Sequence, residues 1–310
     1  MREVVGTAFR EREPGDPDAV RRAADALLGD DGAFRVVLAD GSPLPASEAP
    51  AGVRALPLRE ALAREGARLE PVLGKLAPAE HFAALNAAMF TDGLLVIIEA
   101  GAIVERPISI VHVASASDAP SATYPRVVVI AERGSQATLI ETFLTATEGE
   151  QHLTNAVAEI ALEDGARLDH TRIVLGTGRA FHLAHLAVRQ GRDSAYGSHV
   201  VTLGGALSRL ELEVTLAGEG AEAVLDGVYH VDGSEHVDHQ VFVDHAAPHA
   251  SSQARYRGLL DGKGHAVVNL MGSCARARPA RARTRRTATC CSATTRPSTP
   301  SRTSRSRPTT

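Results

Sequence analysis

The stretch from residue 126 to residue 175 reads RVVVIAERGSQATLIETFLTATEGEQHLTNAVAEIALEDGARLDHTRIVL. It contains one pattern twice: an apolar run, a Glu-x-Gly-small turn and a second apolar run. The turns are Glu132-Arg133-Gly134-Ser135 and Glu163-Asp164-Gly165-Ala166, and similar turns stand at 99–102 and 218–221. Glycine suits a turn with positive φ, and the small residue after it lets the next layer pack closely. A turn that recurs at intervals of a few tens of residues predicts a stacked array.

Short β-rich runs fill the chain on both sides of this stretch, and many of them alternate apolar and polar residues as half-buried strands do. No helical spacing of useful length interrupts them. This favours a β-solenoid, while a β-sandwich stays open as the alternative. The expected strands are 94–98, 108–113, 126–130, 137–143, 156–162, 168–175, 199–203, 210–216, 223–229 and 237–243.

The first ninety residues have a different period. Apolar residues from Val20 to Leu28 follow helical spacing, and Asp16 with Pro17 suits a helix start. Similar spacing predicts helices within 58–76 and 78–90, with a loop-like segment at 40–55. The sequence therefore predicts a helical N-terminal region over 1–91, a β core over 92–271 and a separate tail over 272–310.

Charge separates the tail from the body of the 310-residue chain. Residues 1–271 carry all 37 acidic residues, whereas 272–310 carry ten arginines and no acid. All three cysteines, Cys274, Cys290 and Cys291, lie in the tail, so the body has no disulfide and no thiolate metal site. The sequence shows no secretory signal and no apolar run long enough to span a bilayer, which predicts a cytoplasmic protein without a membrane partner. The absence of tryptophan disfavours an aromatic platform for nucleic acid.

The segment 230–249 is the densest group of titratable residues, with five histidines and four carboxylates. On a strand, His239 and His245 would share one face. Imidazole and carboxylate groups bind Zn²⁺ or Fe²⁺, so His236, His239 and His245 are candidate metal ligands of a metal-dependent all-β enzyme. The alternative is a histidine-rich face of a solenoid whose rings hydrogen-bond between turns or contact a partner.

Other catalytic signatures are missing from the sequence. There is no P-loop, which argues against ATP hydrolysis by this chain, and the glycines near Ser208 do not form a nucleophile elbow. A carbohydrate-active solenoid such as a lyase is a third reading, disfavoured by the lack of a signal peptide and of tryptophan.

A series of short blocks between residues 80 and 270 stands in a specific order and spacing. The blocks are Ala84-Leu85-Asn86-Ala87-Ala88, Asp92-Gly93, Gly101, Glu105, Pro107-Ile108, Glu141, Leu153-Thr154-Asn155, Gly204-Gly205, Ser208-Arg209, Leu216, Gly218, Leu225-Asp226-Gly227-Val228-Tyr229, His236-Val237-Asp238-His239, Asp244-His245, Pro248, Ser251-Ser252 and Tyr256-Arg257-Gly258. Together they resemble the SufB/SufD superfamily of the SUF iron–sulfur cluster assembly system, and SufD more than SufB. The helical N-terminus and the lack of cysteine in the body favour SufD.

This resemblance implies a right-handed parallel β-helix core. It also implies a non-enzymatic scaffold subunit that pairs with SufB through the β-helices and binds the ATPase SufC through its C-terminal region. An iron–sulfur cluster would be held transiently by the full complex, and no cofactor is expected to reside on this chain.

The tail departs from the superfamily pattern. Regrouping its codons by two bases, with suitable codon choices, turns Thr289–Thr295 into L-L-L-S-D-D and Arg302–Thr310 into H-L-E-I-S-A-D-D, which resemble superfamily blocks. We therefore expect a frameshift near residues 269–273, a disordered tail over 272–310 and loss of the SufC-docking region. Resequencing the locus would test this.

Overall fold

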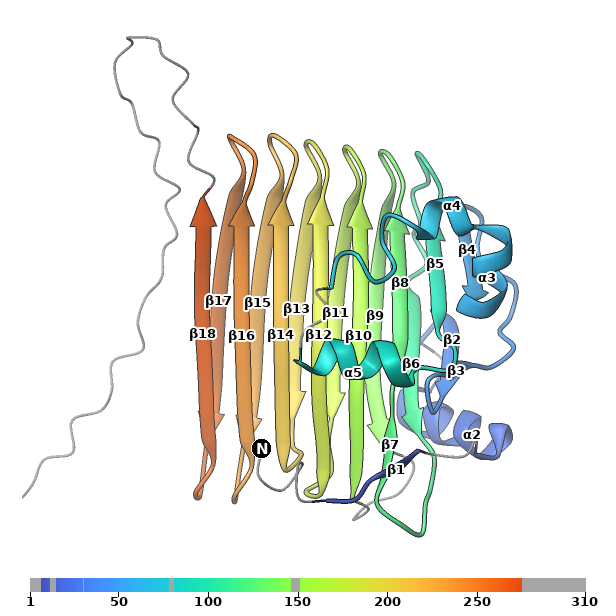
Figure 1. The fold of residues 1–310 in the computed structure, drawn as a ribbon, viewed down its shortest axis with the longest axis vertical. Coiled ribbons are helices and arrows are strands. Elements are labelled where there is room, and N and C mark those ends of the chain that lie inside the picture. The colour runs from blue at the N-terminus through green and yellow to red at the C-terminus, as the bar shows by residue number, and fades with distance from the viewer. Residues whose placement is uncertain (1–6, 12–14, 30, 78–80, 146–150, 275–310) are drawn as a thin grey trace, which may run out of the picture.

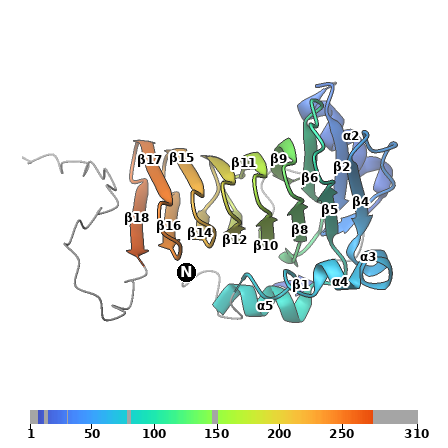
Figure 2. The same cartoon turned by 90° about the horizontal axis from the view of Figure 1, so that it is seen from above.

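The computed structural model describes residues 7–11, 15–29, 31–77, 81–145 and 151–274, which fold around a parallel β-solenoid (Figure 1). Strands alternate between two sheets, so each turn of the chain adds one strand to each sheet (Figure 2). His152 lies beside Ala180 and Leu207 beside His236, all in parallel register. This pairing confirms the solenoid and excludes the antiparallel sandwich.

The first sheet, called sheet A, carries the outer face that residues 58–77 and 81–89 cover. Two short strands, β1 (Arg10–Glu11) and β7 (Ser121–Thr123), pair beside its β10. The other strands, in spatial order, are β18 (His265–Cys274), β16 (His236–His245), β14 (Leu207–Leu216), β12 (Ala180–Gln190), β10 (His152–Leu162), β8 (Arg126–Ala131), β5 (Leu94–Ile98) and β4 (Val53–Pro57).

The second sheet, sheet B, lies opposite, and the two inner faces enclose the core. Its strands, in spatial order, are β17 (Ser251–Leu260), β15 (Glu222–Val231), β13 (Ala195–Leu203), β11 (Arg167–Leu175), β9 (Gln136–Thr145), β6 (Ile108–Ala114), β2 (Phe34–Ala39) and β3 (Ser42–Pro43).

The recurring glycine turns stack on one another at one edge of the solenoid. Gly101, Gly134, Gly165 and Gly220 all have φ near +70°, a conformation that favours glycine. The amide of Gly134 donates to the carbonyl of Asp164 at 3.0 Å, and that of Gly165 donates to the carbonyl of Arg192 at 2.7 Å. Each turn thus hydrogen-bonds to the next, which confirms the repeat expected from the sequence.

The N-terminal region contributes strands as well as helices. Helix α2 (Pro17–Leu28) begins where expected, with the Asp16 side chain accepting from the Asp18 amide at 3.0 Å. The expected helix within 58–76 is shorter and divided into α3 (Leu58–Arg64) and α4 (Gly66–Leu69), and α5 (His81–Met89) follows. Strand β2 joins sheet B beside β6, and β4 pairs antiparallel with β5. The first turns are therefore completed by residues that the sequence reading assigned to helices and linkers.

Strand β18 extends to Cys274, three residues past the core boundary expected at 271. The remainder of the predicted tail lies outside the described residues. None of the helices described is long and apolar enough to cross a bilayer.

Candidate functional site

The three candidate histidines do not converge on one point. All three lie on β16, where His239 and His245 point into the solenoid and His236 lies on the outer face. His239 and His245 are six residues apart on one strand, about 20 Å. Within the described parts of the chain, no group of three or more His, Cys, Asp or Glu side chains is arranged to hold a metal ion.

His236 instead stacks on His265 of the neighbouring strand β18. Their ring centroids are 4.8 Å apart, and their planes differ by 8°. The two Nδ1 atoms are 3.1 Å apart. This contact between neighbouring turns is of the kind expected for a histidine-rich solenoid face whose rings interact with one another, the alternative to a metal site.

A buried carboxylate, Glu141 on β9, is the centre of a polar cluster inside the solenoid. His112 Nε2 donates to its Oε1 at 2.8 Å. His170 Nε2 and Arg172 Nε lie 3.4 and 3.2 Å from its Oε2. Each of these side chains is at most 6% exposed. Arg172 therefore balances the charge of Glu141 in a place that water does not freely reach.

Phe143 holds two of these groups by their flat faces. Phe143 lies on β9. The His112 ring stacks on the Phe143 ring with centroids 4.2 Å apart, and the Arg172 guanidinium lies 4.6 Å from the centroid of the Phe143 ring. His182 approaches the same ring edge-on at 4.6 Å. Within the described residues, the three Arg172 nitrogens have no hydrogen-bond partner. The cation–π contact with Phe143 therefore stabilises the guanidinium in place of hydrogen bonds.

The protonation states follow from this packing. Burial by itself raises the pKa of Glu141, but the charge of Arg172 and the hydrogen bond from His112 hold that pKa well below its usual range. Burial, with the charge of Arg172, lowers the pKa of His182 well below its usual range. At neutral pH the cluster thus contains a negatively charged Glu141, a positively charged Arg172 and an uncharged His182.

A second polar group fills the last turns of the solenoid. His239 Nε2 lies 3.3 Å from the Thr202 hydroxyl, and the rings of Tyr229 and Tyr256 meet the imidazole edge-on at 5.8 and 5.6 Å. Each tyrosine ring lies over a glycine of the neighbouring strand, because Gly258 is in register with Tyr229 and Gly227 with Tyr256. These glycines therefore make room for the rings.

We expect Gly258→Ala to destabilise the fold by about 1–3 kcal/mol, because a Cβ there would lie 1.9 Å from the Tyr229 ring. Urea unfolding measures the change. Gly178→Ala is the matched control, because nothing lies within 4 Å of its Cβ position. Equal midpoints for the two variants would contradict the packing described.

We also expect His239 to make stability depend on pH. Burial lowers the pKa of His239 to about 4, while an unfolded histidine titrates near 6.5. The unfolded chain binds this proton first, so stability decreases as the pH falls from about 6.5 to about 4. Unfolding midpoints at several pH values should show a shallower decrease for His239→Gln. If the stability of His239→Gln decreased with pH as steeply as that of the wild type, other groups would be responsible for the pH dependence.

The outer face of sheet A carries an ion-pair group that the sequence reading missed. Arg209 bonds Glu211 through two nitrogens at 3.1 and 2.6 Å and also pairs with Asp238 of the next strand. His185 lies 3.4 Å from Glu211. These hydrogen bonds, from His185 and then Arg209, outweigh burial and lower the pKa of Glu211 to about 2. Asp238 of β16 thus forms an ion pair with Arg209 of β14, which links the two strands.

Four buried polar residues fasten the N-terminal segments to sheet A; we call them the strap anchor. Glu159 on β10 accepts the amides of Gly74, Leu76 and Ala77 at 2.9–3.1 Å. Arg126 donates to Glu159 at 2.5 Å and to the Asn86 side chain at 3.1 Å. The members of the strap anchor are Glu159, Arg126, Asn86 and Asn155.

The two asparagines of the strap anchor hold α5. The Asn86 side-chain amide donates to the carbonyls of Pro125 and Asn155 at 3.0 and 2.8 Å, and Asn155 donates to the carbonyl of Phe82 at 2.9 Å. The segment 70–77, called the strap, and α5 therefore cover sheet A at fixed places (Figure 1).

The far end of the solenoid from the helices is formed by β17 and β18 (Figure 2). Within the described residues, each of these strands pairs along one edge only. Leu259, Leu260 and Met271 there are 68%, 52% and 53% exposed. An unpaired strand edge beside exposed apolar side chains can accept another strand. This end is therefore the surface best suited to a protein partner.

Comparison with known proteins is consistent with this arrangement. The family described as "SUF system FeS cluster assembly, SufBD core domain" matches residues 112–286. The chain is 32% identical over 150 residues to the iron–sulfur cluster assembly SufBD family protein slr0076 of Synechocystis sp., covering 46% of this chain and 33% of that protein. It is 26% identical over 156 residues to the chloroplastic protein ABCI7 of Arabidopsis thaliana, covering 49% and 33%. The match thus spans about a third of each relative.

Proposed function

This chain belongs to the SufBD core-domain family of the SUF system for iron–sulfur cluster assembly, and we propose that it is a non-enzymatic SufD-type scaffold subunit. In this proposal it pairs with a SufB partner through the β17–β18 end of the solenoid, within a type of complex that acts with the SufC ATPase. The cluster is then cargo of the whole complex. The SufD assignment rests on the helical N-terminal segments and on the absence of cysteine before Cys274.

The observation that carries the proposal is the exposed last turn. Within the described residues, β17 and β18 each have one unpaired edge, and Leu260 at this end continues an inward-facing row whose previous member, Val231, is buried. These features favour a partner that continues the sheets. The buried polar groups support the same reading. Glu141 and its neighbours are enclosed on all sides, so they serve the packing of the solenoid and offer no surface on which a substrate could react.

Co-purification of the full chain with a tagged SufB tests the pairing. Replacing Val268 and Leu270 of β18 by lysine places charge on the inner face of the last turn and should reduce the recovered SufB at least about tenfold. The control variant places lysine at two exposed leucines instead, Leu27 of α2 and Leu62 of α3. These helices lie at the opposite end of the solenoid from β18 (Figure 1). Circular dichroism verifies folding. Undiminished recovery with the folded β18 variant would refute pairing at this end.

We also propose that the reading frame changes near residues 269–273, within β18, and that the chain consequently lacks the SufC-docking region. The arginine-rich composition of 272–310 and the two regrouped blocks support this. Nucleotide sequencing of the locus decides it. An intact frame, with no single-base change that restores the blocks, would refute it.

A further inference from the structure

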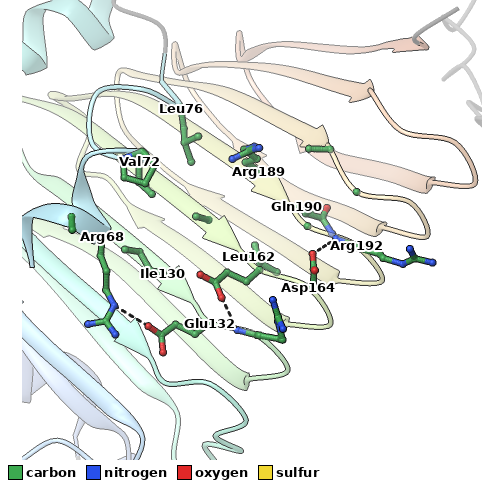
Figure 3. A pocket seen from close by; sticks show the side chains of 18 residues that line it. Arg68, Val72, Leu76, Ile130, Glu132, Leu162, Asp164, Arg189, Gln190 and Arg192 are labelled. Carbon is green, nitrogen blue, oxygen red and sulfur yellow. Dashed lines mark hydrogen bonds and ion pairs between the residues drawn. The ribbon is translucent and has the colours of Figure 1, made fainter. Parts of the chain in front are cut away.

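A groove of about 600 Å³ lies between the N-terminal segments and the turn-bearing edge of sheet A (Figure 3). One wall is formed by α4 and the strap, which contribute Arg68, Val72 and Leu76. The other wall is formed by the turns that follow β8, β10, β12 and β14. Four neighbouring strands at about 4.8 Å spacing give this groove a length of about 14 Å.

The floor of the groove is apolar. Val72 and Leu76 of the strap face Ile130 and Ala161 of the sheet, with Ala217 toward the far end. Ile130 and Val72 belong to a small buried apolar cluster separate from the interior of the solenoid. A ligand in the groove would therefore extend an existing apolar contact.

The acidic residues of the groove are already engaged by the protein. Glu132 pairs with Arg68 at 3.0 Å. Glu163 accepts the backbone amide of Arg133 at 3.0 Å, and Asp164 accepts that of Arg192 at 2.9 Å. Their negative charges thus hold the stacked turns together, as the dashed lines of Figure 3 show.

The arginines of the same rim are less engaged. The guanidinium groups of Arg133 and Arg189 make no hydrogen bond or ion pair with any described residue. Among the residues that the structure describes, the Arg192 guanidinium pairs with two exposed carboxylates, Asp193 at 3.2 Å and Glu219 at 3.9 Å. The lining contains four arginines and three carboxylates, so its formal charge is +1, and within the described residues the oxygens of the carboxylates are engaged while two guanidinium groups keep their donors free. The groove therefore offers an apolar floor with a small excess of positive charge and unused guanidinium donors beside it.

We propose that this groove binds an acidic segment of a partner protein, with apolar side chains against Val72 and Leu76 and carboxylates beside Arg133 and Arg189. The groove is open along its length, which suits a chain segment better than an enclosed small molecule. Guanidinium groups pair with carboxylates through parallel hydrogen bonds, so they select acidic side chains. The proposal is independent of the pairing at β17 and β18.

A labelled, photoreactive peptide of alternating leucine and glutamate tests the proposal on the full chain. Fluorescence anisotropy measures its affinity, and mass spectrometry locates its crosslinks. We expect crosslinks within 67–76 and 189–192, and about tenfold weaker binding to Arg133→Ser/Arg189→Ser. A peptide of alternating leucine and lysine should not bind.

The matched control is Arg167→Ser/Arg257→Ser, which removes the same charge from the outer face of sheet B and should bind as the wild type does. Equal weakening of both double variants would show non-specific attraction and overturn the proposal. Unchanged binding of the groove variant, or crosslinks confined to the arginine-rich residues 275–310, would overturn it as well. Each outcome is readable whether or not the chain pairs with SufB.

Discussion

Replacing Glu159 by alanine should lower the free energy of unfolding by about 3–5 kcal/mol, the range found when one member of a buried ion pair is removed. The side chain of Glu159 is fully buried. Its loss leaves the Arg126 guanidinium without its carboxylate and three strap amides without an acceptor. Urea unfolding measures the loss, and hydrogen exchange over 70–77 should become faster as the strap detaches.

Glu213→Ala is the matched control for this prediction. Glu213 lies in the same outward row of sheet A, in register with Ala187, which is itself beside Glu159. No hydrogen bond or ion pair joins Glu213 to a described residue, so its loss should change stability by less than about 0.5 kcal/mol. Similar losses for the two variants would show that the strap anchor contributes little.

The second large effect is expected inside the solenoid. Arg172→Met should destabilise the chain by about 3–5 kcal/mol, because it leaves Glu141 as an unpaired charge among buried groups. Glu141→Leu should lower the free energy of unfolding by a similar amount, because it leaves the buried Arg172 without its carboxylate partner. The double variant should lose much less than the sum, because an apolar pair of similar volume requires no charge compensation.

A double-mutant cycle by urea unfolding measures this coupling, which we expect to exceed about 2 kcal/mol. Additive losses would instead mean that Arg172 and Glu141 act independently. The low pKa of Glu141 gives a second readout. The folded chain keeps this carboxylate ionised, so its contribution is present above a pH near 4.5 and is lost as the pH falls further. Glu141→Leu should remove that part of the pH dependence.

Much of the fold was predictable because two local signals agree along the core. Alternation of apolar and polar residues marks strands such as β9 and β16, and glycines such as Gly134 mark the turns. Strand β12 was missed because it is buried on both faces. Its run AFHLAHLAVRQ then alternates too little to be distinguished from a buried helix. Strand β2 was missed because its partner β6 lies 74 residues away along the chain.

The sites were predictable only in part. Alternation places His239 and His245 on one face of β16, and the structure shows that this is the buried, inner face. The same alternation assigns His236 to the opposite face, so proximity in sequence was a poor guide to a shared ligand. Glu141 shares the parity of Leu139 and Phe143 and could have been recognised as buried. Its partner Arg172 could not, because strand register depends on turn lengths that the sequence alone does not determine.

The ion pair between Glu141 and Arg172 also constrains how such a protein can change in length. A solenoid turn contacts only its neighbours, so a turn with an aliphatic interior could be duplicated or deleted without disturbing distant parts. The turns that contain β9 and β11 are not interchangeable in this way, because a copy of one without the other would leave a single charge in the interior. Evolutionary insertions of whole turns should therefore be found on either side of this pair and not between its members.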